Sequence, residues 1–190
     1  MNGHALRLIL ATPVAITMLA SPVSASQWAV VPAQSSITFT SEWSGQTVEG
    51  RFPKFAANVR FDPKKLGEAR VDGVIDLSAA TANDKTVNGS LPGPDWFDVK
   101  ANRNARLQLT QITQRKPGQY IARGTISMRG VAVPVTLPFT LAIKGDTAVM
   151  TGQAMLDRRP FKIGMDSDST ANWVAFQVPV KVRIVANRLK

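Results

Sequence analysis

The stretch FQVPVKVRIV, residues 176–185, alternates apolar and polar side chains more clearly than any other part of the chain. Val178, Val180 and Val182 would lie on one side of an extended backbone, with Gln177 and Lys181 on the other. A period of two is typical of a strand with one buried face. The stretch therefore predicts a β-strand that covers an apolar interior.

The same period recurs from residue 36 onward, interrupted by short turn signals such as Pro117-Gly118 and residues 144–146. It predicts about eight strands. One or two short helices are expected, at residues 63–69 and 83–91. Internal repeats and linkers are absent from the sequence, so we predict one all-β domain. Periodicity alone does not separate a barrel from a sandwich.

The predicted inner faces mix small residues with large ones, and two interpretations stay open. Small side chains on an inner wall leave space, and a closed eight-stranded sheet can hold one small ligand. Glycines also mark bulges and sharply twisted positions in any curved sheet. The small residues concerned are Gly50, Ala57, Gly73, Ala122, Gly124, Gly152 and Ala154.

The first 25 residues have the order of a secretory signal peptide. Arg7 is their only charged residue, Leu8 to Ala20 is almost wholly apolar, and Val23 and Ala25 stand at the small-residue positions before a cleavage point. A membrane span would need roughly 20 apolar residues, and the run from Leu8 to Ala20 is too short for one. We therefore expect residues 1–25 to be removed, residues 26–190 to form the domain, and the protein to reach the periplasm.

Composition excludes several kinds of chemistry. The chain has no cysteine, and its single histidine, His4, lies in the predicted leader. A Ser-His-Asp triad and a His or Cys metal site are therefore excluded from residues 26–190. The net charge is +10, but the cations are single or paired, which does not favour nucleic acid as a partner.

The remaining candidates for chemistry are acids and aromatic residues. Asp95 with Asp98 could form a carboxylate pair, but ordinary loop roles are favoured, as is a polar turn over residues 165–172. Trp96, Phe97 and Phe161 lie near strand ends, where aromatic rings either close a core or hold an apolar ligand. The cations beside Phe161 also allow two interpretations: they form a site for an anionic headgroup, or they form a cluster on the surface. These cations are Arg158, Arg159 and Lys162.

An ordered set of segments resembles the YceI family of exported lipid-binding proteins. SSITFTSEWSGQTVEGRFPKFAANVRFDP at 35–63 is similar to the family's opening, and LPGPDWFDV at 91–99 to its central signature. GTISMRGVAVPVTLPFTL at 124–141, MTGQAMLDRRPFKIGM at 150–165 and VPVKVRIVANR at 178–188 are similar to its later hairpins and last strand. Two positions depart from the family pattern: KANRNARL follows WFDV in place of a Tyr-Pro pair, and Val87-Asn88 stands where an Arg-Asp pair is common.

This resemblance implies an extended, lipocalin-like antiparallel eight-stranded β-barrel that binds or carries a polyprenyl, quinone or similar long amphiphilic lipid. It implies no catalysis, and no cofactor or metal is expected. We predict that Trp96 lies at the mouth and that Arg158 contacts the ligand. The predicted wall residues are Phe39, Phe52, Phe55, Phe97, Phe139 and Phe161.

An alternative function is a non-catalytic module that docks on a membrane cytochrome of the b561 type or on another envelope partner. This alternative rests on relatives that lie beside or are fused to such a cytochrome. A homodimer is a further prediction.

Overall fold

A computed structural model describes residues 25–43 and 45–190, so the predicted signal peptide lies almost wholly outside the described residues. Eleven strands form one sheet in which every pair is antiparallel. The strands are β1 (Gln27–Val30), β2 (Ser36–Trp43), β3 (Gln46–Arg51), β4 (Phe55–Arg60), β5 (Arg70–Asp76), β6 (Thr81–Ala82), β7 (Asn104–Lys116), β8 (Gln119–Met128), β9 (Val131–Lys144), β10 (Thr147–Asp157) and β11 (Gln177–Arg188).

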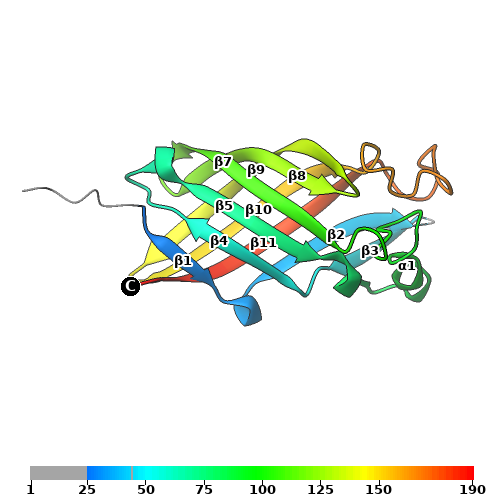
Figure 1. Cartoon of the computed structure of the whole chain (residues 1–190), viewed down its shortest axis with the longest axis horizontal. Helices are drawn as coiled ribbons and strands as arrows, with labels where there is room; N and C mark the ends of the chain where they lie inside the picture. The colour runs from blue at the N-terminus through cyan, green and yellow to red at the C-terminus, as the bar shows by residue number, and fades with distance from the viewer. Residues whose placement is uncertain (1–24, 44) are drawn as a thin grey trace, which may run out of the picture.

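Eight of these strands close into a barrel, which confirms the predicted fold (Figure 1). Their order is β1-β4-β5-β7-β8-β9-β10-β11, and the ring closes where Trp28 pairs with Arg188 and Val30 with Ala186. Closure gives each barrel strand a neighbour on both sides and removes free sheet edges. The strands expected from residue 36 onward include β2 and β3, which lie outside the ring, whereas β1 and the two-residue β6 were not anticipated.

The additional strands β2, β3 and β6 extend the sheet from β11. β1 and β2 pair with the same edge of β11 and are separated by the 3₁₀ turn Pro32–Gln34. Proline favours this interruption because it has no N–H to donate to a ladder. As a result, β1 pairs with β4 at one end of the barrel, whereas β2 pairs with β3 at the other.

The two ends of the barrel differ (Figure 1). The hairpin end carries the short β7–β8 and β9–β10 turns and the chain's C-terminus. The loop end carries helix α1 (Lys85–Ser90) and two capping loops, which we define as residues 91–103 and 158–176. The helix confirms the prediction for residues 83–91, whereas residues 63–69 contain only the 3₁₀ turn Leu66–Glu68.

Within the described residues, no helix is long and apolar enough to span a bilayer. The interior is a single cluster of buried apolar side chains, and it follows the alternation predicted from the sequence. Ala105, Leu109 and Ile112 of β7 all face inward, although the last two are an odd number of residues apart. The ladder shifts register between Leu109 and Gln111, and this bulge accounts for the extra residue.

Candidate functional site

The barrel interior contains two adjoining cavities. The inner cavity lies in the barrel body and has a volume of about 190 Å³. The outer cavity lies toward the capping loops and has a volume of about 130 Å³. Five apolar residues line both cavities and mark the boundary between them: Ile37, Ile75, Ile126, Leu156 and Val180.

Small residues make room for the inner cavity, while other glycines serve a different purpose. The small residues Ala57, Gly73, Ala122 and Ala154 line the cavity, as the first interpretation of the sequence predicted. At Gly50, by contrast, a Cβ atom would lie 2.0 Å from the Phe39 ring, so the missing side chain allows the ring to cover the strand. The first interpretation therefore holds for the residues that line the cavity, and the second holds for Gly124, which pairs with Leu109 beside the register shift of β7. Gly50 is a third case, a close contact with a ring.

An aromatic cluster seals the inner cavity at the hairpin end. The rings of Phe61 and Tyr120 meet edge to face at 5.6 Å, and Tyr120 stacks on Phe139 at 5.3 Å between centroids. Trp28 is buried beside them and donates a hydrogen bond from Nε1 to the Phe61 carbonyl at 2.9 Å. The indole N–H is thus satisfied in an apolar surrounding, as a stable buried tryptophan requires.

A second aromatic series lines the outer cavity. Phe39 and Phe52 lie 5.2 Å apart between ring centroids, and Phe52 and Phe97 lie 5.8 Å apart. Phe161, which is only 1% exposed, comes from the second capping loop. Together these rings form a continuous apolar lining that extends from the barrel strands to both capping loops.

The structure brings every predicted site residue to the wall of one of the two cavities. The outer cavity is lined by Phe39, Phe52, Trp96, Phe97, Arg158 and Phe161. The inner cavity is lined by Phe55 and Phe139. Ligand contact by these residues stays a prediction. The aliphatic residues at the boundary were not among the predicted site residues, although the alternation of residues 36–185 identifies them as inward-facing.

Arg158 organises the second capping loop from its buried interior. It is 3% exposed, and its Nη2 donates to the Asp168 carboxylate at 2.9 Å. Nη1 donates to the carbonyls of Ile163 and Gly164, and Nη2 also donates to that of Val174. Asp168 in turn accepts hydrogen bonds from three backbone N–H groups of residues 172–174.

The environment of Arg158 shifts its pKa in two opposite directions. Burial lowers the pKa of the guanidinium below its usual value, and the carboxylate of Asp168 opposes this shift. The sequence left open whether Arg158 meets a headgroup or belongs to a surface cluster. The structure shows that it is buried and paired with Asp168, which excludes the surface cluster, and contact with a headgroup stays a prediction. Likewise, residues 165–172 are more than the polar turn that was favoured, because Asp168 is a buried anchor.

Asp95 joins the two capping loops. Its carboxylate accepts hydrogen bonds from the backbone N–H groups of Asp166 and Ser167, at 2.9 and 3.1 Å, and from the Ser167 hydroxyl. Its carbonyl accepts a hydrogen bond from the Gly164 N–H at 2.6 Å. Burial raises the pKa of Asp95, but these hydrogen bonds lower it more, so the pKa lies below its usual value.

Trp96 packs over the second capping loop, beside this connection. Gly164 has a φ of +65°, and a Cβ atom there would lie 3.1 Å from the Trp96 ring. Arg129 donates a hydrogen bond to the Trp96 carbonyl. Asp98 accepts a hydrogen bond from the Asn102 side chain at 3.0 Å. The acids on either side of Trp96 and Phe97 therefore fix loop geometry, as the sequence favoured.

No group of three His, Cys, Asp or Glu side chains is placed to hold a metal ion in the part of the chain that the structure describes. The arrangement that remains is an elongated apolar interior. It is sealed by aromatic rings at the hairpin end and covered by two connected loops at the other. Such a cavity can bind an apolar molecule, and the loops are the part that could admit it.

Comparisons with known proteins agree with this arrangement. A model of the YceI-like domain matches residues 28–186. A UPF0312 protein of Vibrio campbellii is 24% identical over 145 residues, covering 73% of this chain and 77% of that protein.

Solved structures show the same fold. BcnA of Burkholderia cenocepacia has a TM-score of 0.79 and 31% identity, covering 83% of this chain and 99% of that chain. A polyisoprenoid binding domain of Saccharophagus degradans, implicated in plant cell wall breakdown, has a TM-score of 0.64 and 13% identity, covering 85% and 98%. The second identity supports likeness of fold alone. Because the family model covers most of its length, this chain belongs to the YceI-like domain family.

Proposed function

We propose that the protein binds or carries a long isoprenoid-like lipid, such as a polyprenyl or quinone, inside its barrel. The observation that carries the proposal is the pair of adjoining apolar cavities, sealed at one end by Trp28, Phe61 and Tyr120. The polyisoprenoid binding domain with the same fold supports this ligand class. An extended apolar tail suits an elongated cavity better than a compact ligand does.

Burial of the tail would supply the affinity. Each buried methylene contributes about 0.8 kcal/mol. Association itself costs about 4–15 kcal/mol. Micromolar binding, which needs about −8 kcal/mol net, therefore requires a tail of well over ten buried carbons. Short fatty acids should bind weakly by the same reasoning.

Entry should occur at the loop end. The two cavities together are only about as large as the roughly 300 Å³ lower limit for small-molecule pockets, so a long tail needs more room. The aromatic cluster and continuous strand ladders enclose the hairpin end. The capping loops are held to one another chiefly by Asp95, so they are the elements that can separate without breaking the barrel.

We further propose that the protein acts without catalysis and in the periplasm. Residues 26–190 contain no His or Cys. Asp157, which lines the outer cavity, is paired with Arg159, and Asp95 and Asp168 hold loop backbone. The leader supports export. Cleavage after Ala25, detected by intact-mass spectrometry of protein from the periplasmic fraction, would test this. A b561-type cytochrome partner and a homodimer stay predictions, to be tested by co-purification and sedimentation.

The decisive experiment is organic extraction of the purified exported protein, followed by mass spectrometry. We expect a prenyl-chain lipid in near-stoichiometric amount. Ala154→Phe places a ring in the inner cavity and should reduce lipid content at least fivefold, while Ala142→Phe on the exposed face of β9 should not. Ala154→Leu is a milder version if the larger residue impairs folding. A clean extract, with no uptake of prenyl lipid or fatty acid, would overturn the proposal.

A further inference from the structure

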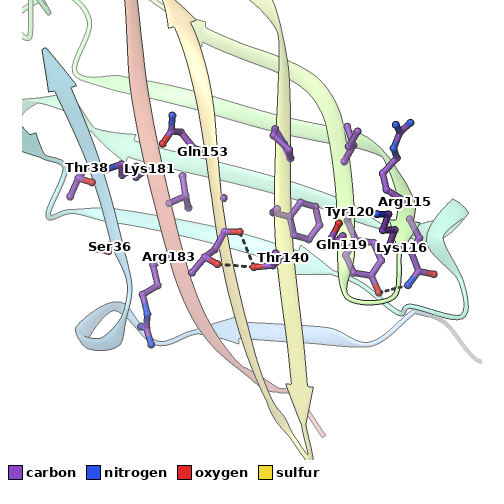
Figure 2. A pocket seen from close by; sticks show the side chains of 17 residues that line it. Ser36, Thr38, Arg115, Lys116, Gln119, Tyr120, Thr140, Gln153, Lys181 and Arg183 are labelled. Atoms are coloured by element: carbon purple, nitrogen blue, oxygen red, sulfur yellow. Dashed lines mark hydrogen bonds between the residues drawn. The ribbon is translucent and has the colours of Figure 1, made fainter.

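A second concave feature lies on the outside of the barrel. It is a broad, shallow groove of about 1150 Å³ over the outer faces of β2, β11, β10 and β9, and the β7–β8 hairpin forms one wall (Figure 2). Unlike the interior cavities, it is rich in charged and polar side chains. It is separated from the interior by the sheet, so a ligand here would not depend on the proposed lipid.

The groove carries positive charge on both walls. Arg115 and Lys116 lie at the hairpin on one side, and Lys181 and Arg183 project from β11 on the other (Figure 2). All four side chains belong to exposed residues. The lining, which falls wholly within the described residues, includes no Asp or Glu.

Most of this charge is not neutralised by neighbours. Arg183 donates a hydrogen bond to the Gln34 carbonyl, which leaves its charge in place. The side chains of Arg115, Lys116 and Lys181 form no hydrogen bond or ion pair with any residue that the structure describes. Lys181 also borders a smaller depression that includes Glu49, but the two are not paired. Three exposed cations are thus available to an anionic ligand.

The floor between the walls presents hydroxyl and amide groups. Thr140 and Thr151 face one another across β9 and β10, with their hydroxyl oxygens 2.8 Å apart (Figure 2). Thr38, Gln119 and Gln153 add further groups that can both donate and accept. Neutral polar groups of this kind match sugar hydroxyls and ether oxygens.

We infer that this groove binds a chain of an acidic polysaccharide. Cations on opposite walls with a hydroxyl-rich floor between them suit a ligand that alternates carboxylate or sulfate groups with sugar hydroxyls. A planar lipid surface would meet the cations of the two walls but leave the hydroxyl and amide groups of the floor without partners. Nucleic acid recognition in such a groove relies on aromatic rings that stack on bases, whereas the lining Tyr120 is buried and already stacked on Phe139.

The test measures binding of polygalacturonate and dextran sulfate by calorimetry, with uncharged dextran for comparison. The unmodified chain should bind both anionic polymers, with affinity that falls as salt rises because exposed charges are screened. Binding to uncharged dextran should not be detectable. Equal binding to all three polymers, or to none, would overturn the inference.

Two matched variants locate the site. Arg115→Gln, Lys116→Gln and Lys181→Gln together remove three charges from the groove. Lys54→Gln, Lys64→Gln and Lys85→Gln remove three charges from exposed positions elsewhere. The groove variant should lose at least tenfold in affinity and the control less than threefold.

Equal losses would assign binding to overall charge and refute the groove. Binding to vesicles that contain half anionic lipid, without binding to either polysaccharide, would assign the surface to membranes and also refute it. Thermal unfolding of both variants confirms that the fold is intact, since all six side chains are exposed.

Discussion

Replacing Asp168 by Ala should destabilise the protein more than any change at a neighbouring acid. The carboxylate is buried, pairs with Arg158 at 2.9 Å and accepts three backbone N–H groups. Its removal leaves a buried guanidinium without a counter-charge. Breaking one partner of such a pair typically costs about 3–5 kcal/mol.

The lost hydrogen bonds act in the same direction. Each buried N–H that loses its acceptor costs about 1–3 kcal/mol. These amounts do not simply add, because residues 172–174 belong to a loop that can relax and admit water. We therefore expect a loss of about 4 kcal/mol in the free energy of unfolding. For a domain of this size that corresponds to about 8–16 °C in Tm.

The assay is urea unfolding followed by tryptophan fluorescence, with Asp166→Ala as the control. Asp166 is exposed, and only its backbone N–H makes a hydrogen bond. The control should therefore change stability by no more than about 0.5 kcal/mol. The double variant Arg158→Met, Asp168→Leu should recover much of the loss, because it leaves no unpaired charge.

Two outcomes would refute the reasoning. A loss below about 1 kcal/mol for Asp168→Ala would show that the pair does not anchor the loop, since it lies under the cost expected for a buried unpaired charge. A double variant that is less stable than both single variants would show that side-chain packing, not charge, determines the effect.

Three further predictions concern the capping loops and the sealed end. Folding lowers the pKa of Asp95, so its ionised carboxylate stabilises the folded state. This stabilisation is complete above the unfolded pKa of about 3.9 and is lost as pH falls through the lower folded pKa. The stability difference between the unmodified chain and Asp95→Asn should therefore be constant from pH 5 to 7 and shrink below about pH 4 in urea titrations; a difference that grows toward low pH would contradict it. Gly164→Ala should cost about 1–3 kcal/mol, because φ is +65° and the new Cβ would meet the Trp96 ring at 3.1 Å. An unchanged unfolding midpoint would show that this contact is not tight. Tyr120→Ala should cost about 3–5 kcal/mol by removing a buried ring, and extraction should show lower lipid content because the sealed end is opened. Full lipid content would mean that the ring does not close the cavity.

Much of the barrel could be predicted from the sequence. The alternation of residues 36–185 identified the inward faces, and the resemblance identified the closed sheet and the aromatic residues that line both cavities. The sequence predicted β2 and β3 as strands, but it did not reveal that they leave the ring and form an extension with β6. That extension depends on a proline-containing interruption between β1 and β2, whose consequence appears only when both strands meet β11.

The loops were harder to predict than the strands. In residues 158–176 nothing repeats, so the direction of each side chain is set by its particular contacts and not by a period. Arg158 and Arg159 are adjacent and chemically alike, yet Arg158 is buried with Asp168, whereas Arg159 is exposed and pairs with Asp157. Only the folded loop distinguishes them.

By itself, the sequence predicted an all-β protein with an export signal, and it determined that residues 26–190 lack the side chains for thiol or imidazole chemistry. The reason is that composition and the pleat of a strand act locally, residue by residue. The tertiary structure decided where the barrel closes, which end is sealed by aromatic rings and which loops cover the other end. Those features depend on partners far apart in the chain, such as Trp28 with Phe61, Asp95 with Ser167 and Val30 with Ala186. Their meeting is set by the packing of the whole sheet.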